Sequence, residues 1–131
     1  MIPAKPRYGR PKRETHYERR GAVAVIHVEH EDLMEKMQRC GQEVAAQDWV
    51  KAAVIDLKHV DMIISSHVSQ ITLAYDALNQ KRIGVYIYNM KKGRHDALEL
   101  IGFTSLDGVY VRQEESLDEA VAAIAKKVAG Q

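Results

Sequence analysis

Residues 50–67 read VKAAVIDLKHVDMIISSH, and the interpretation of the whole chain depends on them. The segment 50–57 is mostly apolar and rich in β-branched side chains, which is typical of a buried strand. A short polar turn follows, and Ser65 and Ser66 then precede apolar residues at helical spacing. We therefore expect a strand that leads into a helix N-terminus, where free backbone N–H groups are available to anionic groups.

Patterns elsewhere in the chain predict an alternation of strands and helices. A turn at Gly21 between two strand-like segments indicates an opening β-hairpin. Single helices between the later strands favour a largely parallel sheet with right-handed crossovers. The expected fold is therefore an α/β domain with a mixed, mostly parallel sheet of about four to five strands and about four helices. Strands are expected at residues 13–18, 22–28, 50–57, 83–90 and 108–112, and helices at 32–47, 65–82, 97–101 and 116–128.

The first 20 residues differ in composition from the rest of the chain. They hold seven basic and two acidic residues, a charge of +5, whereas the remaining residues carry a charge of −4. All three prolines of the chain also lie there. We expect residues 1–12 to form a disordered basic arm and residues 13–131 to form one domain. The arm is interpreted as a solubilising tail, with a weak contact to nucleic acid as the alternative.

Several classes of protein are not expected from this sequence. Cys40 is the single cysteine, so no disulfide framework is expected, and no apolar run approaches the about 20 residues that cross a membrane. The basic N-terminus lacks the apolar segment of a secretory signal, and we expect a cytoplasmic protein. His27 and His30 flank Glu29, but a strand sends the two imidazoles to opposite faces, so no metal site is expected.

The sequence also lacks the motifs of the common catalytic and cofactor sites. There is no glycine-rich phosphate loop and no Gly-x-Ser-x-Gly turn around a nucleophile. Ser66, His67 and Asp61 are close in sequence, but neighbouring residues at a helix start point in different directions. We therefore expect a protein that is not an enzyme and has no cofactor.

Several segments resemble STAS domains, the fold of the anti-sigma factor antagonists. The run Val54-Ile55-Asp56-Leu57, followed by Val60, is similar to the strand-and-turn signature of that family, and the two serines follow at the family's spacing. Three more segments match in the family's order. They are RIGVYIY at 82–88, ALELIGF at 97–103 and SLDEA at 116–120, so that the resemblance extends from about residue 15 to residue 128.

The resemblance implies a regulatory switch. In this family an unphosphorylated antagonist binds an anti-sigma factor that is itself a serine kinase, and the kinase can phosphorylate a serine at the start of the second helix. A metal-dependent serine phosphatase reverses the modification. The resemblance makes Ser66 and then Ser65 the phosphorylation candidates. A simple N-cap that satisfies a helix N–H group is the alternative role for Ser65.

The chain departs from the family at this motif. The family's usual Asp-Ser-Ser/Thr-Gly reads Ile64-Ser65-Ser66-His67 here. Ile64 cannot cap a helix, and His67 lacks the conformational freedom of glycine and adds a group that titrates near neutral pH. These changes point to a divergent partner or to weak phosphorylation. The expected partner-binding residues are Asp61, Ile64, Ser65, Ser66, His67, Ser69, Gln70 and Tyr75, with Gln70, Tyr75 and Asn79 as candidates on the exposed face of the helix.

Two other functions stay open at this point. One is a scaffold or accessory subunit of a larger complex, in which the serine junction is an interface without a phosphorylation cycle. The other is a small-ligand or nucleotide-binding module, for which the basic segment KKGR at 91–94 is the candidate.

Overall fold

The computed structural model describes residues 14–29, 33–60, 65–88, 106, 108–112 and 114–130, without the side chains of 33–35 and 65. The expected basic arm, the expected helix at 97–101 and the basic segment at 91–94 lie outside the described residues. Within the described part of the chain, no helix combines the length and the apolar character needed to cross a membrane.

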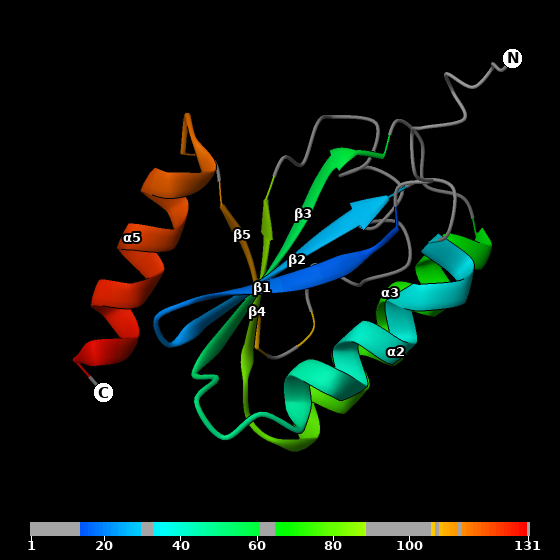
Figure 1. Cartoon of the computed structure of the whole chain (residues 1–131), viewed down its shortest axis with the longest axis horizontal. Coiled ribbons are helices and arrows are strands. Elements are labelled where there is room, and N and C mark those ends of the chain that lie inside the picture. Colours follow the sequence, from blue (N-terminus) through cyan, green and yellow to red (C-terminus); the bar gives the residue numbers. More distant parts are fainter. Residues whose placement is uncertain are drawn as a thin grey trace, which may run out of the picture.

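The strands form a single five-stranded sheet in the order β1-β2-β3-β4-β5 (Figure 1). β1 pairs with β2 antiparallel, and the three other pairings are parallel. This confirms the expected mixed, mostly parallel sheet with an opening hairpin. The strands are β1 (His16–Arg20), β2 (Val23–Glu29), β3 (Ala52–His59), β4 (Gly84–Tyr88) and β5 (Val109–Arg112).

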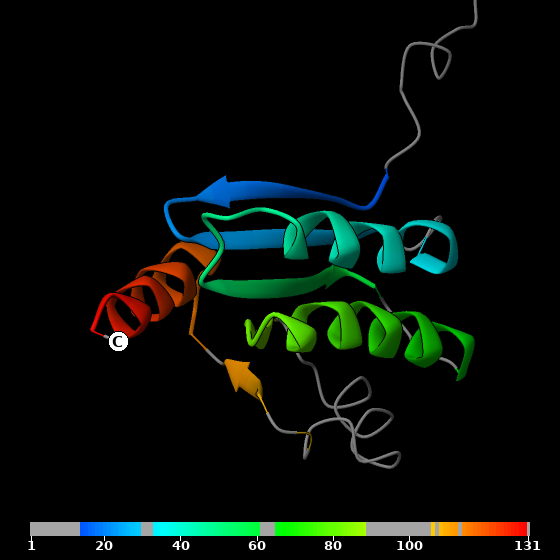
Figure 2. The same cartoon turned by 90° about the horizontal axis from the view of Figure 1, so that it is seen from below.

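The described helices are α2 (Leu33–Ala45), α3 (Ser65–Gln80) and α5 (Leu117–Ala129). Figures 1 and 2 show α2 and α3 side by side on one face of the sheet and α5 on the opposite face. Right-handed crossovers between parallel strands in sequential order place their helices on the same side, which explains the pairing of α2 with α3.

The face under α2 and α3 is the larger part of the core. Alternate residues of β2, β3 and β4 point into it, and all of them are apolar and buried. Gly41 brings the two helices together, because a Cβ at this position would lie only 2.7 Å from Ala74 Cα. The apolar residues at helical spacing in the three helices are buried: Met37, Cys40, Val44, Ile71, Ala74, Leu78, Ala120, Val121, Ile124 and Val128.

The opposite face is apolar only where α5 covers it. Val25 of β2 and Val54 of β3 are wholly buried beneath α5. Two residues further along each strand, the same face presents His27 and Asp56. The sheet therefore changes from apolar to polar on this face as the parallel strands approach their carboxyl ends.

Candidate partner-binding site

The serine junction is the connection between β3 and α3. The turn after β3 is anchored by Val60, which is wholly buried and donates its N–H group to the Leu57 carbonyl at 3.0 Å. Residues 61–64 lie outside the described residues, so the expected roles of Asp61 and Ile64 remain predictions. α3 then begins at Ser65, and both serines fall in its first turn, where backbone N–H groups have no partner within the helix.

The first two turns of α3 mix buried and accessible side chains. Ser66 and Gln70 are half-buried and Ser69 is exposed, whereas His67 is buried. A modification at Ser66 would therefore lie at the boundary between core and surface. His67 occupies the position of the family's glycine and belongs to the interior of the domain rather than to a free surface.

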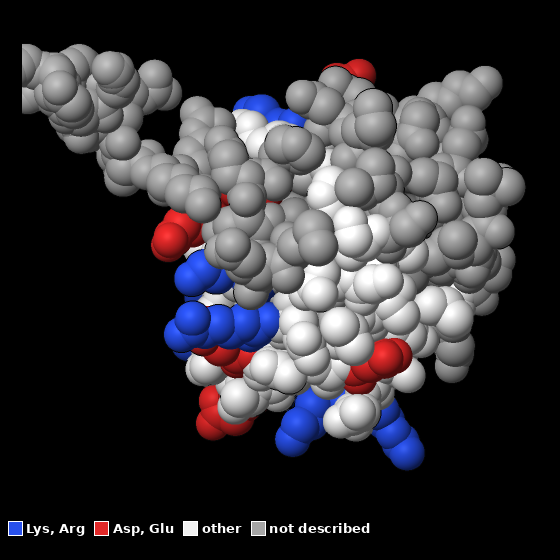
Figure 3. Space-filling view, turned by 90° about the vertical axis from the view of Figure 1, so that its right-hand side faces the viewer, with Lys and Arg blue, Asp and Glu red and all other residues white. Residues whose placement is uncertain are grey.

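The surface of α3 carries very little charge. Asp76 is the single acidic or basic residue among its 16 residues, and Leu73 is a large apolar side chain that is 38% exposed. Figure 3 shows an uncharged band beside a group of charged side chains on this side of the molecule. Depletion of charge around an exposed apolar side chain is characteristic of the centre of protein–protein interfaces.

One of the expected surface positions needs correction. Tyr75 was expected on the exposed face of the helix, but it is only 6% exposed and packs in the core beneath α2 and α3. The reason is that Ile71, Ala74, Tyr75 and Leu78 together form the stripe that faces the sheet. Asn79 is exposed, as expected, and lies at the C-terminal end of α3, where it lines a cavity.

A cluster of titratable side chains lies at the carboxyl ends of β2 and β3, on the α5 face. His27 Nε2 lies 2.6 Å from Glu18 Oε1, and His27 Nδ1 lies 3.6 Å from Asp56 Oδ2. The rings of His16 and His27 stack with centroids 5.1 Å apart. Asp56 is also fixed by its own strand, because its Oδ1 accepts the Lys58 N–H group at 3.0 Å.

These contacts change the acidity of the groups. The carboxylate of Asp56, and then that of Glu18, raises the pKa of His27 above its ordinary value, while burial opposes the change. Asp56 has the larger effect although it is farther away, because its side chain is only 6% exposed and water screens it less than Glu18. The hydrogen bond with His27 lowers the pKa of Glu18.

The cluster borders a cavity of about 470 Å³ at the carboxyl edge of the sheet. Tyr88 closes one side, where its hydroxyl donates to the Glu114 carbonyl at 3.0 Å and burial raises its pKa. On the other side His59 Nε2 lies 3.9 Å from Glu29 Oε2. The cavity is lined by His27, Asp56, Lys58, His59, Tyr88, Glu115, Ser116 and Leu117.

The chemistry available at this cavity is that of a polar contact surface. Among the described residues no group of three or more His, Cys, Asp or Glu side chains is arranged to hold a metal ion. The histidine is held between two carboxylates, and Ser66 belongs to α3, on the opposite face of the sheet from His27. The geometry therefore provides hydrogen bonds and charge at the same edge as the serine junction.

Glu18, Asp56 and Tyr88 were not among the residues predicted to belong to a site. The alternation of strand residues places positions 27, 56 and 88 on a common face once the strands are aligned. The alignment itself is not visible in the sequence, because the structure pairs His27 with Asp56, and Asp56 with Tyr88, only through the register of the parallel ladders. Positions 27, 56 and 88 share one sequence signal for this cluster, which is a polar side chain near the end of an apolar strand.

Comparison with known proteins gives matches at the level of structure alone. No family model and no curated protein sequence matches the chain. Among solved structures, the unphosphorylated anti-sigma factor antagonist SpoIIAA superposes with a TM-score of 0.65 at 13% identity, covering 85% of this chain and 97% of that one. The phosphorylated form of the Bacillus SpoIIAA gives a TM-score of 0.62 at 13% identity, with 84% and 98% covered.

A third match comes from a different member of the same structural group. A variant of RsbS from Moorella thermoacetica superposes with a TM-score of 0.67 at 11% identity, covering 87% of this chain and 99% of that one. These proteins match over almost their whole length. The chain has the STAS fold of the anti-sigma factor antagonists.

Proposed function

We propose that this chain is a non-enzymatic regulatory domain that binds a serine-kinase anti-sigma factor in the cytoplasm, in the manner of an anti-sigma factor antagonist. The observation that carries the proposal is the position of Ser65 and Ser66, which fall in the first turn of α3 within a fold shared with such antagonists. A phosphate added there would meet the positive end of the helix dipole.

The docking surface of the proposal is the N-terminal half of α3. Its partly and fully exposed side chains are small, uncharged or apolar, with Ser69, Gln70 and Leu73 as the accessible centre. Such a surface can be desolvated at low cost, because no Lys, Arg, Asp or Glu within this half has to leave water. The titratable cluster around His27 lies at the same edge of the sheet but on the opposite face, outside this docking surface.

Phosphorylation of Ser66 would act on this surface through charge. A phosphoserine carries about −1.5 to −2 charges at neutral pH. In the free domain the helix N-terminus and water stabilise that charge, whereas in a complex the half-buried position of Ser66 forces it out of water. The modified domain should therefore dissociate from its partner without losing its fold.

A pair of substitutions at Ser66 tests this mechanism. Ser66→Asp introduces a charge. Ser66→Asn is the matched control, because asparagine has nearly the size of aspartate and no charge. We expect Ser66→Asn to bind the serine-kinase anti-sigma factor of the same genome within about threefold of the unmodified chain, and Ser66→Asp to bind at least about tenfold more weakly, as measured by titration calorimetry. Equal affinities for all three proteins would remove the switch from the proposal.

Phosphorylation itself is measured by mass. Incubation with the kinase and ATP should add about 80 Da to the chain, and the doubly substituted Ser65→Ala/Ser66→Ala protein should gain nothing. A metal-dependent serine phosphatase should then restore the original mass. Stable binding with no mass increase would instead support the scaffold function, which Ile64 and His67 at the family's aspartate and glycine positions favour.

A further inference from the structure

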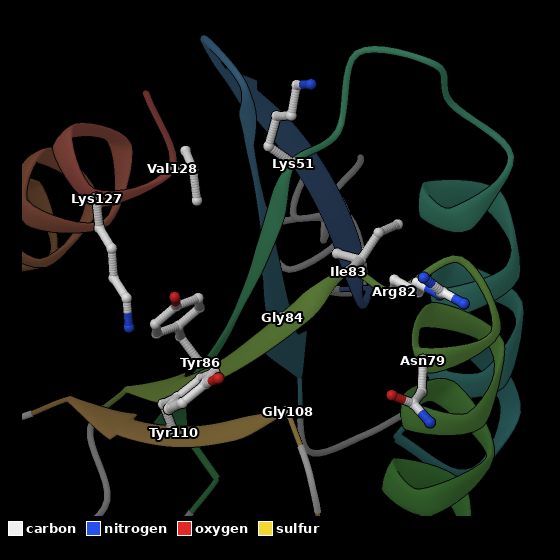
Figure 4. A pocket seen from close by; sticks show the side chains of 10 residues that line it. All are labelled: Lys51, Asn79, Arg82, Ile83, Gly84, Tyr86, Gly108, Tyr110, Lys127 and Val128. Carbon is white, nitrogen blue, oxygen red and sulfur yellow. The ribbon is translucent and has the colours of Figure 1, made fainter. Parts of the chain in front are cut away.

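A second cavity lies at the opposite edge of the sheet, at the amino ends of the parallel strands, and its volume is about 480 Å³ (Figure 4). The residue before β3, the start of β4 and the approach to β5 contribute to it, together with the C-terminal ends of α3 and α5. This volume falls in the range typical of small-molecule sites. The serine junction, at the start of α3, takes no part in the cavity.

The described residues that line this cavity carry charge of one sign. Lys51, Arg82 and Lys127 line it, and none of the other described lining residues is a carboxylate. None of the three forms an ion pair with another described residue, in contrast to Arg20 and Arg112, which each contact a carboxylate. Three cations that share one concave surface, with no carboxylate among the described lining residues, repel one another, and a bound anion would relieve that repulsion.

An aromatic pair positions one of these cations. Tyr86 and Tyr110 are cross-strand partners, and their rings stack with centroids 5.0 Å apart. Lys127 Nζ lies 4.6 Å from the centroid of Tyr110 and 5.7 Å from that of Tyr86, as Figure 4 illustrates. Gly84 makes room for the pair, because a Cβ there would approach Tyr86 Cε1 to 3.3 Å. The ammonium group is therefore held over the cavity floor before any ligand arrives.

The backbone conformation of Arg82 also indicates that this cavity has a function. It has φ +59°, and its N–H group donates to the Asn79 carbonyl at 2.9 Å, while Ile83 N–H donates to the Leu78 carbonyl at 3.1 Å. This is a Schellman termination of α3, with Arg82 at the left-handed position that glycine usually occupies. An arginine there is less stable than a glycine, and residues held in such conformations concentrate at functional sites.

We propose that this cavity binds a small, multiply charged phosphate compound. Lys127 on its aromatic support and Arg82 and Lys51 at the rim would contact the phosphate oxygens. Arg82 can do so with two parallel N–H groups, which suits a phosphate better than a point charge does. The site is separate from the serine junction, and this proposal does not depend on the proposed partner.

The test is a titration of the full chain with inorganic pyrophosphate at constant ionic strength, read as a thermal shift and by calorimetry. We expect saturable binding that an equal ionic strength of sodium chloride does not reproduce. Arg82→Gly should raise the melting temperature of the free protein, because glycine fits the left-handed position, and should weaken pyrophosphate binding roughly tenfold. Lys127→Gln should weaken it by a similar factor.

Lys81→Gln is the matched control, because Lys81 is an exposed neighbour that does not line the cavity, and its affinity should stay within about twofold of the unmodified chain. Ser66→Asp should also leave pyrophosphate binding unchanged, which separates this site from the partner-binding surface. A comparison of pyrophosphate with ATP shows whether the nucleoside part of the ligand adds affinity. Absence of saturable binding of both compounds, or equal binding by Arg82→Gly and Lys81→Gln, would overturn the proposal.

Discussion

On the face covered by α2 and α3, β2, β3 and β4 present apolar side chains that are buried, whereas on the face covered by α5 the apolar surface ends after Val25 and Val54. Beyond that point, toward the carboxyl ends of the strands, the second face carries a histidine between two carboxylates and borders a cavity. The difference indicates that one face supplies most of the stability of the domain. The other face carries polar, titratable groups where the apolar surface ends.

The largest predicted effect is the loss of stability when a buried isoleucine on either face is replaced by alanine. Ile55 and Ile124 are both wholly buried, one beneath α2 and α3 and the other on α5. Ile55→Ala should lower the free energy of unfolding by about 4 kcal/mol, and Ile124→Ala by about 3 kcal/mol, because a single helix can settle into the space more easily than two helices. Urea denaturation measures both values, and an equal or larger loss for Ile124→Ala would contradict the division between the faces.

The close approach of α2 and α3 gives the next prediction. Glycine to alanine in a helix interior normally stabilises by up to about 1 kcal/mol. At Gly41 the added Cβ would lie 2.7 Å from Ala74 Cα and 3.0 Å from the Ala74 carbonyl oxygen, so the helices must separate. We expect Gly41→Ala to destabilise the domain by about 2 kcal/mol in urea denaturation. A gain in stability would show that the two helices are not tightly packed.

The polar face should respond to pH. Because the pKa of His27 is raised above 6.5, its stabilising contribution is complete below about pH 6.5 and is lost as the pH rises through the higher value of the folded state. We expect the unmodified chain to be about 1 kcal/mol more stable than His27→Gln near pH 5.5, with the difference disappearing by about pH 9.

That magnitude is modest because Glu18 is 41% exposed and water weakens its contact with the imidazolium. Glu18→Gln is the companion variant, and it should reduce the pH dependence without abolishing it, since Asp56 remains. A stability difference between the unmodified chain and His27→Gln that stays constant from pH 5.5 to pH 9 would rule out this charge cluster.

Most elements of the fold could be predicted from residue patterns, because each has a local cause. The apolar stripe of α5 and the cap formed by Ser116, whose hydroxyl accepts the Glu119 N–H group at 3.1 Å, are both visible in the sequence. Strand ends were less accurate. The first strand was expected at residues 13–18 but is His16–Arg20, because the turn is made by Gly21 at φ +64° and pairing continues up to it.

The sites were harder to predict because they depend on tertiary structure. The contact between Glu18, His27 and Asp56 requires the registers of two strand pairs, which no local pattern defines. Arg82 in the left-handed conformation contradicts the residue preference for that position, so a local rule gives the wrong expectation. Tyr75 was expected on the exposed face of the helix, but the width of the apolar stripe on α3 buries it.

The central claim is that a partner docks on the serine end of α3. Hydrogen exchange of the chain, measured alone and in complex with a serine-kinase anti-sigma factor, tests it most directly. We predict slower exchange in the first half of α3, beginning at Ser65, and unchanged exchange throughout α5. Protection of α5 with unchanged exchange in α3 would contradict the claim, because the partner would then occupy the opposite face of the sheet.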